Sequence, residues 1–294
     1  MRVPSAACCV LAACMAIDAT PAAQEQSRYA LVGVVDETGA PMMGLGSGDF
    51  IVENDHRRCD VIGVTPAAYP IAVVVDTSAF ATSEFQLMRQ AVERFVDRAS
   101  GERDVAVYAS GSPVTKVVDF TRDHDALARG VTRLFASRTA TTHTLETIRE
   151  AAEDLRARHA PVTGIVVTSA GGIETTAPRT ADVLPVVLAS HAIVHIVDRR
   201  SLRLNQGTNH QSQLRSPQSG GGDVLESLAL RTSGKYIRGA AGAVYSSGLD
   251  TVGRELDSEV IMEYAVAKSA RYDLHVGLIV VGSLGRAIGL DNAR

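Results

Sequence analysis

The chain has 294 residues, of which 46% are hydrophobic and 21% are charged, a balance typical of a folded protein with a substantial core. Its net charge of -4 at pH 7 gives no overall positive field, and its few aromatic residues, 4% with no tryptophan, do not favour recognition of bases or sugars by stacking. Nucleic acid is therefore excluded as the expected partner. The length allows one large domain with an accessory segment, or two small domains.

Residues 1–23 have the pattern of a signal peptide for export. Arg2 gives a positively charged start, residues 6–17 are apolar, and small residues precede Gln24. The apolar stretch is too short to form a transmembrane segment. A second alternative is a lipoprotein signal at residues 11–14, in which Cys14 carries a lipid anchor; the apolar residues after Cys14 favour plain secretion. Both alternatives predict a protein that is secreted or held in the periplasm or cell envelope.

The cysteines exclude an internal disulfide in the mature chain. Cys8, Cys9 and Cys14 lie in the signal segment, which leaves Cys59 alone. A single thiol without an evident histidine or aspartate partner is typically a small buried side chain, so we expect neither metal binding nor catalysis from Cys59.

The segment 24–68 predicts a small antiparallel β unit. Strand patterns occur at 29–35, 50–53 and 58–64. Asn54 and Asp55 form a hairpin-type turn between the last two. The glycines at 44–48 do not form a dinucleotide-binding motif, because the third glycine is misplaced and no helix follows.

Strands and helices alternate over residues 69–259. The run from Ile71 to Val75 is apolar without alternation, which indicates a strand buried on both faces of a parallel sheet. Further strands are expected at 105–109, 114–120, 165–168 and 193–197. Helices are expected at 84–96, 125–135, 144–158, 181–190 (with Pro185 in its first turn), 223–234 and 249–259. Short connections predict an α/β fold with a doubly wound, mostly parallel sheet and helices on both faces.

The segment 199–222 interrupts this alternation with a long basic loop. It contains four arginines and no acidic residue, and a loop of this length is either functional or disordered. The C-terminal part, 260–294, has strand patterns at 264–267 and 274–281, which we expect to pack with the N-terminal β segment.

Four segments of the chain carry a resemblance to a known family. They are DETGAPMMGLGSGDFIVEND at 36–55, PIAVVVDTSAF at 70–80, IVHIVDRRSL at 193–202 and LESLALRTSGKYI at 225–237. In this order they resemble the von Willebrand factor type A fold, and more closely the bacterial secreted proteins that carry a domain related to it. The resemblance covers about Tyr29 to Val281.

The resemblance implies a metal-ion-dependent adhesion site, in which carboxylate and hydroxyl oxygens from three loops bind Mg²⁺. Asp76, Ser78 and Thr142 occupy three of its five positions. Phe80 stands where a second serine is expected, and Ser169 stands where a second aspartate is expected. Because hard cations are held largely by charge, we predict a degenerate site without Mg²⁺ or another cofactor. The alternative role for Asp76 is a structural one, as a helix cap or an acceptor for loop amides.

The topology predicts that the basic loop lies over this site, because the strand before it ends at the same edge of the sheet. Arg199 or Arg200 would then supply the positive charge of the missing cation and, with Ser169, contact an acidic partner. The alternative is a solvated, flexible loop.

The sequence therefore predicts an exported, non-enzymatic module for protein binding, adhesion or scaffolding. It would act through the loop edge of the sheet on an unidentified protein partner, without a metal ion. The alternative is a secreted serine hydrolase that uses Ser78 or Ser169 with His143. The sequence has no G-x-S-x-G motif, which argues against the hydrolase.

Overall fold

The computed structural model describes residues 25–290, without 37, 39, 43, 173–179, 201–219, 268–272 and 279–283. The predicted signal peptide with Cys14 lies outside the described residues, as do Arg203 and Arg215 of the basic loop. Among the described residues, no helix has the length and apolar character needed to cross a membrane.

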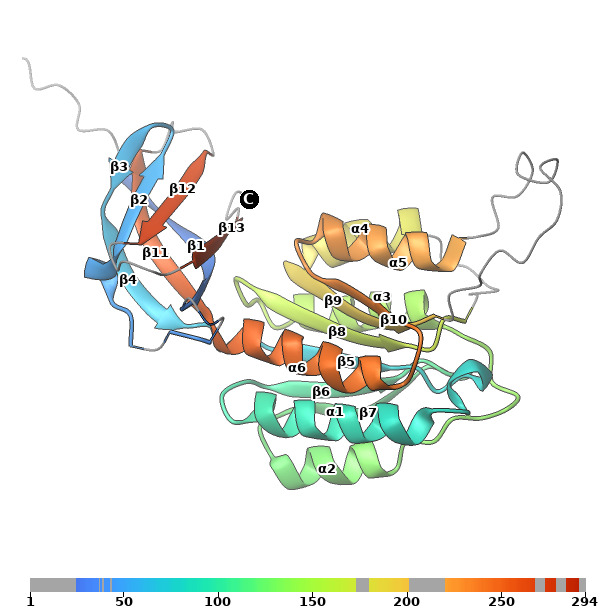
Figure 1. Ribbon diagram of the computed structural model, residues 1–294. Coiled ribbons are helices and arrows are strands. Elements are labelled where there is room, and N and C mark those ends of the chain that lie inside the picture. Colours follow the sequence, from blue (N-terminus) through green and yellow to red (C-terminus); the bar gives the residue numbers. More distant parts are fainter. Residues whose placement is uncertain are drawn as a thin grey trace, which may run out of the picture.

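The larger part of the molecule is built on a six-stranded sheet with the strand order β10-β9-β8-β5-β6-β7 (Figure 1). The strands are β5 (Ile71–Val75), β6 (Val105–Ala109), β7 (Thr115–Thr121), β8 (Thr163–Ser169), β9 (Ala192–Arg199) and β10 (Tyr236–Gly239). Only the edge strand β7 runs antiparallel. Every residue of β5 and β8 is buried. The prediction of a doubly wound, mostly parallel sheet is confirmed.

Helices cover both faces of this sheet (Figure 1). One layer contains α1 (Phe85–Ser100), α2 (His124–Thr132) and α6 (Ala243–Asp257), and the other contains α3 (Thr144–Arg156), α4 (Thr180–Ala189) and α5 (Gly220–Arg231). Successive strand side chains point to opposite faces, so Val73 packs in the first layer and Val74 in the second. The apolar run of β5 is uninterrupted because its side chains fill two hydrophobic cores, one between the sheet and each helix layer.

The remaining strands form an antiparallel β unit from both ends of the chain. One sheet has the order β13-β1-β11-β4, and a smaller one has the order β12-β2-β3. The strands are β1 (Glu25–Val35), β2 (Phe50–Asn54), β3 (Arg57–Cys59), β4 (Val61–Pro66), β11 (Glu259–Ala267), β12 (Leu274–Leu278) and β13 (Leu284–Leu290). Two short 3-10 helices, Ser47–Asp49 and Ala79–Ala81, complete the described elements. The predicted β unit from the N-terminal and C-terminal segments is confirmed.

Several helices differ in detail from the sequence-based expectations; for example, α1 extends to Ser100 and α5 spans Gly220–Arg231. Helix α6 begins at Ala243 rather than 249, and Gly248 within it packs closely on Val197 of β9. Pro185 lies inside α4 rather than in its first turn, with its ring on the exposed side of the helix. Helix α2 ends at Thr132, before the predicted end at 135.

Cys59 is buried in the core of the β unit, as expected for a lone thiol. Its Sγ lies 3.5 Å from the backbone oxygen of Arg57, and burial raises the pKa of the thiol. This environment does not activate a nucleophile, which requires a lowered pKa.

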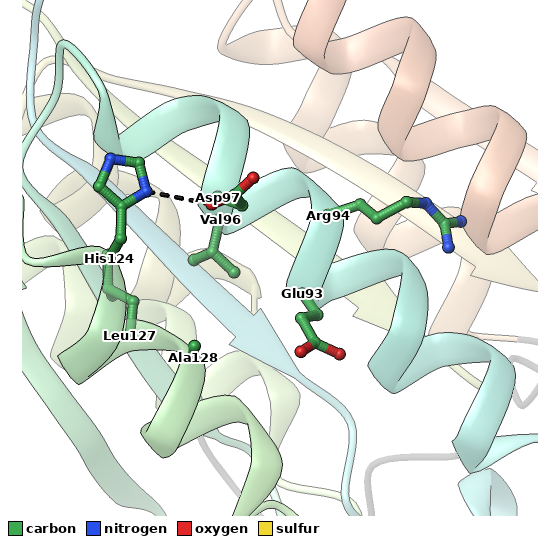
Figure 2. A pocket seen from close by; sticks show the side chains of 7 residues that line it. All are labelled: Glu93, Arg94, Val96, Asp97, His124, Leu127 and Ala128. Atoms are coloured by element: carbon green, nitrogen blue, oxygen red, sulfur yellow. Dashed lines mark hydrogen bonds and ion pairs between the residues drawn. The ribbon is translucent and has the colours of Figure 1, made fainter.

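Helices α1 and α2 lie side by side and leave a hollow of about 310 Å³ between them (Figure 2). His124 and Asp97 line it, with His124 Nδ1 3.1 Å from the Asp97 carboxylate. Glu93 and Arg94 also line this hollow, so its wall carries both negatively and positively charged side chains.

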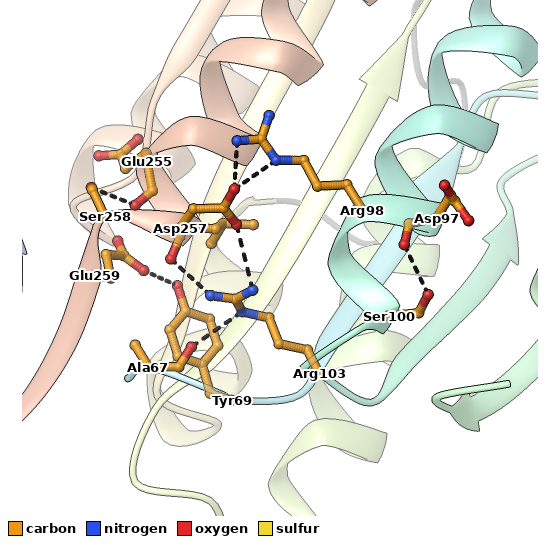
Figure 3. A network of polar contacts seen from close by, with 11 residues as sticks. Ala67, Tyr69, Asp97, Arg98, Ser100, Arg103, Glu255, Asp257, Ser258 and Glu259 are labelled. Carbon is orange, nitrogen blue, oxygen red and sulfur yellow. Dashed lines mark hydrogen bonds and ion pairs between the residues drawn. The ribbon is translucent and has the colours of Figure 1, made fainter. Parts of the chain in front are cut away.

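A buried arginine joins the α/β part to the β unit (Figure 3). Arg103 donates from Nε to the backbone oxygen of Ala67 (3.1 Å) and from Nη2 to that of Leu256 (2.8 Å). Its Nη1 lies 3.8 Å from the carboxylate of Asp257. Beside it, the hydroxyl of Tyr69 donates to Glu259 at 2.5 Å. One guanidinium therefore holds the chain at both places where it passes between the α/β part and the β unit.

A polar cluster at β6 and β7 makes stability depend on pH. The Asp154 carboxylate accepts from the Tyr108 hydroxyl (2.6 Å) and lies 2.8 Å from Lys116 Nζ. Burial alone would raise the pKa of Asp154, but the hydrogen bonds from Lys116 and Tyr108 and the charge of Lys116 outweigh it, so the pKa is lowered. A lowered carboxyl pKa contributes stability above the pKa of the unfolded chain, about 4, and loses it as the pH falls through the folded value.

We expect the Asp154→Asn variant to lack this dependence. The difference in free energy of unfolding between the wild type and the variant should narrow as the pH falls below about 4. Urea unfolding at a series of pH values measures this difference. Glu153→Gln is the control, because Glu153 lies on the exposed side of α3, the helix that also carries Asp154. A difference that stays constant from neutral to acid pH would contradict the expectation.

Candidate functional site

The loop edge of the sheet, where β5, β8 and β9 end, brings together most of the predicted site residues. Asp76 follows β5 directly and is fully buried. Its Oδ1 accepts from the amide of Ser78, and its Oδ2 accepts from the amide of Ala170, both at 2.9 Å. Asp76 therefore ties its own loop to the loop that follows β8, as the structural alternative for this residue predicts.

Two predicted ligands, Ser78 and Thr142, are also buried at this edge. Their hydroxyl oxygens have no hydrogen-bond partner among the described residues. A Cβ placed on Gly172 would lie 2.4 Å from Thr142 Oγ1 and 2.8 Å from the ring of Phe80, so these three residues pack closely. Phe80 itself remains 50% exposed, so the rim of the site presents an aromatic ring where a ligating serine was expected.

Ser169 ends β8 and is buried. Its hydroxyl accepts from the amide of Gly171 at 3.1 Å, and its backbone oxygen accepts from the hydroxyl of Tyr245 at 3.1 Å. Burial raises the pKa of Tyr245, although the positive charge of Arg199 partly opposes this, so Tyr245 stays a neutral donor. The polar atoms of Ser169 are thus used within the protein.

Arg199, at the end of β9, reaches into this edge as the topology predicts. Its Nη2 donates to the backbone oxygens of Phe80 (3.3 Å) and Ala170 (3.4 Å), and its Nε lies 3.4 Å from the carboxylate of Glu84. The side chain is only 16% exposed. One guanidinium therefore connects the loop after β5, the loop after β8 and the start of α1.

Arg200 has a different environment. Its Nε lies 2.7 Å from the buried carboxylate of Asp198, which also accepts from the hydroxyl of Tyr236. The structure thus brings Asp76, Ser169 and Arg199 together at one rim and directs Arg200 toward β10. Sequence reasoning did not identify Glu84 or Tyr245, which complete the contacts of Arg199 and Ser169.

The donor set does not fit a hard divalent cation. The two buried hydroxyls of Ser78 and Thr142 are oxygens of the right kind, but they carry no charge. The single carboxylate, Asp76, already accepts two amide hydrogens. The described residues contain no group of three or more histidine, cysteine or acidic side chains suited to a metal ion.

The hydrolase alternative requires a serine hydrogen-bonded to His143. His143 Nδ1 lies 3.1 Å from Glu146 Oε2, and its Nε2 lies 2.8 Å from Thr141 Oγ1. The Ser78 hydroxyl has no partner among the described side chains, and the Ser169 hydroxyl bonds the Gly171 amide. Neither serine is therefore arranged with His143 as nucleophile and base.

A second serine–histidine–aspartate group lies beside the hollow of Figure 2. The Ser100 hydroxyl and the Asp97 carboxylate both lie 3.1 Å from the same nitrogen, His124 Nδ1. A catalytic histidine uses one ring nitrogen for the nucleophile and the other for the carboxylate. This arrangement therefore does not form a catalytic triad.

Comparisons with known proteins agree with the fold. Residues 71–173 match the family model of the von Willebrand factor type A domain. No curated protein sequence matches the chain. Among solved structures, the von Willebrand domain of the type V pili tip protein Mfa5 from Porphyromonas gingivalis is 18% identical, with a TM-score of 0.34, over 36% of this chain and 38% of that one.

Two further structures cover more of the chain. The conserved hypothetical protein BatB from Bacteroides thetaiotaomicron is 10% identical, with a TM-score of 0.48, over 64% of this chain and 98% of that one. Proximal thread matrix protein 1 from the mussel byssus is 13% identical, with a TM-score of 0.49, over 66% of this chain and 49% of that one. Residues 71–173 therefore match the von Willebrand factor type A domain, and the sheet order and the helices on both faces of the sheet agree with that fold.

Proposed function

We propose that this chain is an exported, non-enzymatic protein-binding module, of the adhesion or scaffold kind, that acts through its loop edge without a metal ion. The observation that carries the proposal is the position of Arg199. Its guanidinium contacts the backbone of two loops and the Glu84 carboxylate, at the edge where Asp76 lies buried. These contacts support a rim in which a positive charge of the chain itself, rather than a bound cation, holds the loops.

The loops are joined by fixed contacts at this edge. Asp76 connects the loop after β5 to the Ala170 amide, and Arg199 connects the same two loops through the oxygens of Phe80 and Ala170. Preorganised loops lose little conformational entropy when a partner binds. Loops held in this way support binding of a partner protein that does not require a cation.

Phe80 is the most exposed of the predicted site residues that the structure describes. Exposed aromatic side chains at the centre of an interface commonly supply a large share of the binding energy. Since Arg199 is mostly covered, we assign the direct contact to Phe80 and a positioning role to Arg199. The proposal thus refines the expectation that the arginines themselves contact the partner.

Site-specific cross-linking tests the proposal. We expect a photo-reactive benzophenone amino acid at position Phe80 to form a covalent adduct with a partner protein in the cells that produce the chain, with the same yield in the presence of EDTA. The control position is Leu230, which is 65% exposed at the end of α5 that precedes β10, and so lies at the opposite edge of the sheet. Equal labelling at both positions, or an adduct abolished by EDTA, would contradict the proposal.

Calorimetric titration tests the metal independence separately. We expect the mature protein to show no saturable binding of Mg²⁺, Mn²⁺ or Ca²⁺ below millimolar concentration, because one carboxylate supplies too little charge. Ser78→Ala is the matched variant, since it removes a hydroxyl that has no partner among the described residues. Tight binding in the wild type that is lost in Ser78→Ala would show that the site retains its ion.

A further inference from the structure

Two hollows at the loop edge share a wall formed by Leu134 and Phe135. The first, about 200 Å³, lies between the loop after β6 and the segment after α2, and Thr77 beside Asp76 lines it. The second, about 350 Å³, lies against the start of α1, where Phe85 lines it. Both hollows therefore continue the edge that carries Asp76 and Phe80.

Phe135 is the most exposed of the large hydrophobic side chains in the described part of the chain, at 75%. The early end of α2 at Thr132 explains its position, because the turn that follows directs Leu134 into the core and Phe135 into solvent. Burying an exposed phenylalanine side chain against apolar atoms is favourable, because it removes apolar surface from water. The described contacts of this chain leave that gain unused.

The two hollows are also positively charged. Arg133 lines the first and Arg89 lines the second, and no acidic residue lines either one. Arg89 donates to the backbone oxygen of Thr132 at 3.1 Å, and within the described residues no ion pair of Arg89 or Arg133 with a carboxylate is present. This local charge is opposite in sign to the net charge of -4 of the whole chain.

We propose that the double hollow around Phe135 binds an acidic segment of the partner protein. An aromatic or large aliphatic side chain of that segment packs against Phe135, and its carboxylates pair with Arg133 and Arg89. The charge complementarity selects this occupant, because a guanidinium binds a carboxylate with two parallel hydrogen bonds. The inference rests on the proposed function and names the chemistry of the partner.

A peptide selection tests this assignment. A displayed library of random twelve-residue peptides is selected on the mature protein, and the enriched peptides are titrated by fluorescence polarisation. We expect enrichment of sequences that combine aspartate or glutamate with an aromatic or large aliphatic residue. Phe135→Ser and Arg133→Glu should each raise the dissociation constant at least tenfold.

Matched controls come from the opposite edge of the sheet. Leu230→Ser removes an exposed apolar side chain from the end of α5, and Arg156→Glu reverses an exposed charge at the end of α3. Both should leave the dissociation constant unchanged. Since all four substitutions are at exposed positions, they are expected to leave the fold intact.

Three outcomes would overturn the inference. The first is enrichment of basic or uncharged peptides, and the second is an equal loss of peptide affinity in the variants and their controls. The third is that no peptide binds, while the wild type binds vesicles of phosphatidylglycerol and Phe135→Ser abolishes that binding. Cross-linking from position 80 in the Phe135→Ser chain separates this inference from the proposed function. An adduct that persists there while the peptides fail leaves the proposed function standing and rejects the acidic segment.

Discussion

Replacing Arg103 by leucine should lower the free energy of unfolding by about 2–6 kcal/mol, because two buried backbone oxygens lose their donor at about 1–3 kcal/mol each. Arg103 is 2% exposed and holds the backbone oxygens of Ala67 and Leu256, which leucine cannot do. Ala67 lies on the connection from the β unit to the α/β part, and Leu256 lies in the last turn of α6, just before the chain returns to the β unit. Denaturant unfolding, followed with one probe in the α/β part and one in the β unit, measures the loss in free energy of unfolding. It also shows whether the two parts then unfold in separate transitions.

Arg98→Leu provides a close control for this measurement. Arg98 contacts the same carboxylate, Asp257, with its Nε 2.6 Å away, but its side chain is 39% exposed (Figure 3). Exposed ion pairs contribute about 0–1 kcal/mol, so Arg98→Leu should cost far less than Arg103→Leu. Similar losses in the two variants would show that Asp257, rather than the two backbone oxygens, accounts for the effect.

Replacing Asp76 by alanine should lower the free energy of unfolding by about 2–6 kcal/mol in the presence of EDTA. The substitution leaves the buried amides of Ser78 and Ala170 without their acceptor, and each such loss costs about 1–3 kcal/mol. Thermal and denaturant unfolding of the metal-free protein provide the measurement.

Ser78→Ala again serves as the comparison, because its hydroxyl has no partner to lose among the described residues. We expect a change within about 1 kcal/mol for this variant. The result distinguishes two roles for Asp76. A residue kept only as a metal ligand would be neutral or stabilising to remove in EDTA, since it is a buried charge without its ion. A neutral Asp76→Ala would therefore reject the structural role.

Much of the fold could be predicted from the sequence because its strongest signals are periodic. The unbroken apolar run of β5 requires two covered faces, and the alternation that follows requires a parallel sheet. Once the strands are parallel, their carboxyl ends share one edge, so the meeting of Asp76, Ser169 and Arg199 follows from topology. The β unit was predictable because its strand patterns lie at both ends of the chain.

The details of the site could not be predicted, because they depend on contacts between distant segments. Arg199 turns inward because two backbone oxygens accept hydrogen bonds from it and the carboxylate of Glu84 lies 3.4 Å from its Nε, while the adjacent Arg200 turns toward Asp198. Nothing in their spacing distinguishes these two arginines. The exposure of Phe135 likewise depends on where α2 ends, and element boundaries are the least reliable part of a sequence-based prediction.

The pairing of β1 with β11 and β13 has a consequence for biogenesis. These partners come from opposite ends of the chain, with the whole α/β part between them in sequence. A ribosome or secretion channel releases β1 long before the strands that complete its hydrogen bonds, so the unpaired strand is exposed to aggregation in the meantime. Maturation should therefore end with closure of the β unit, and premature stop codons within the last strands should yield a folded α/β part with an open, adhesive β edge.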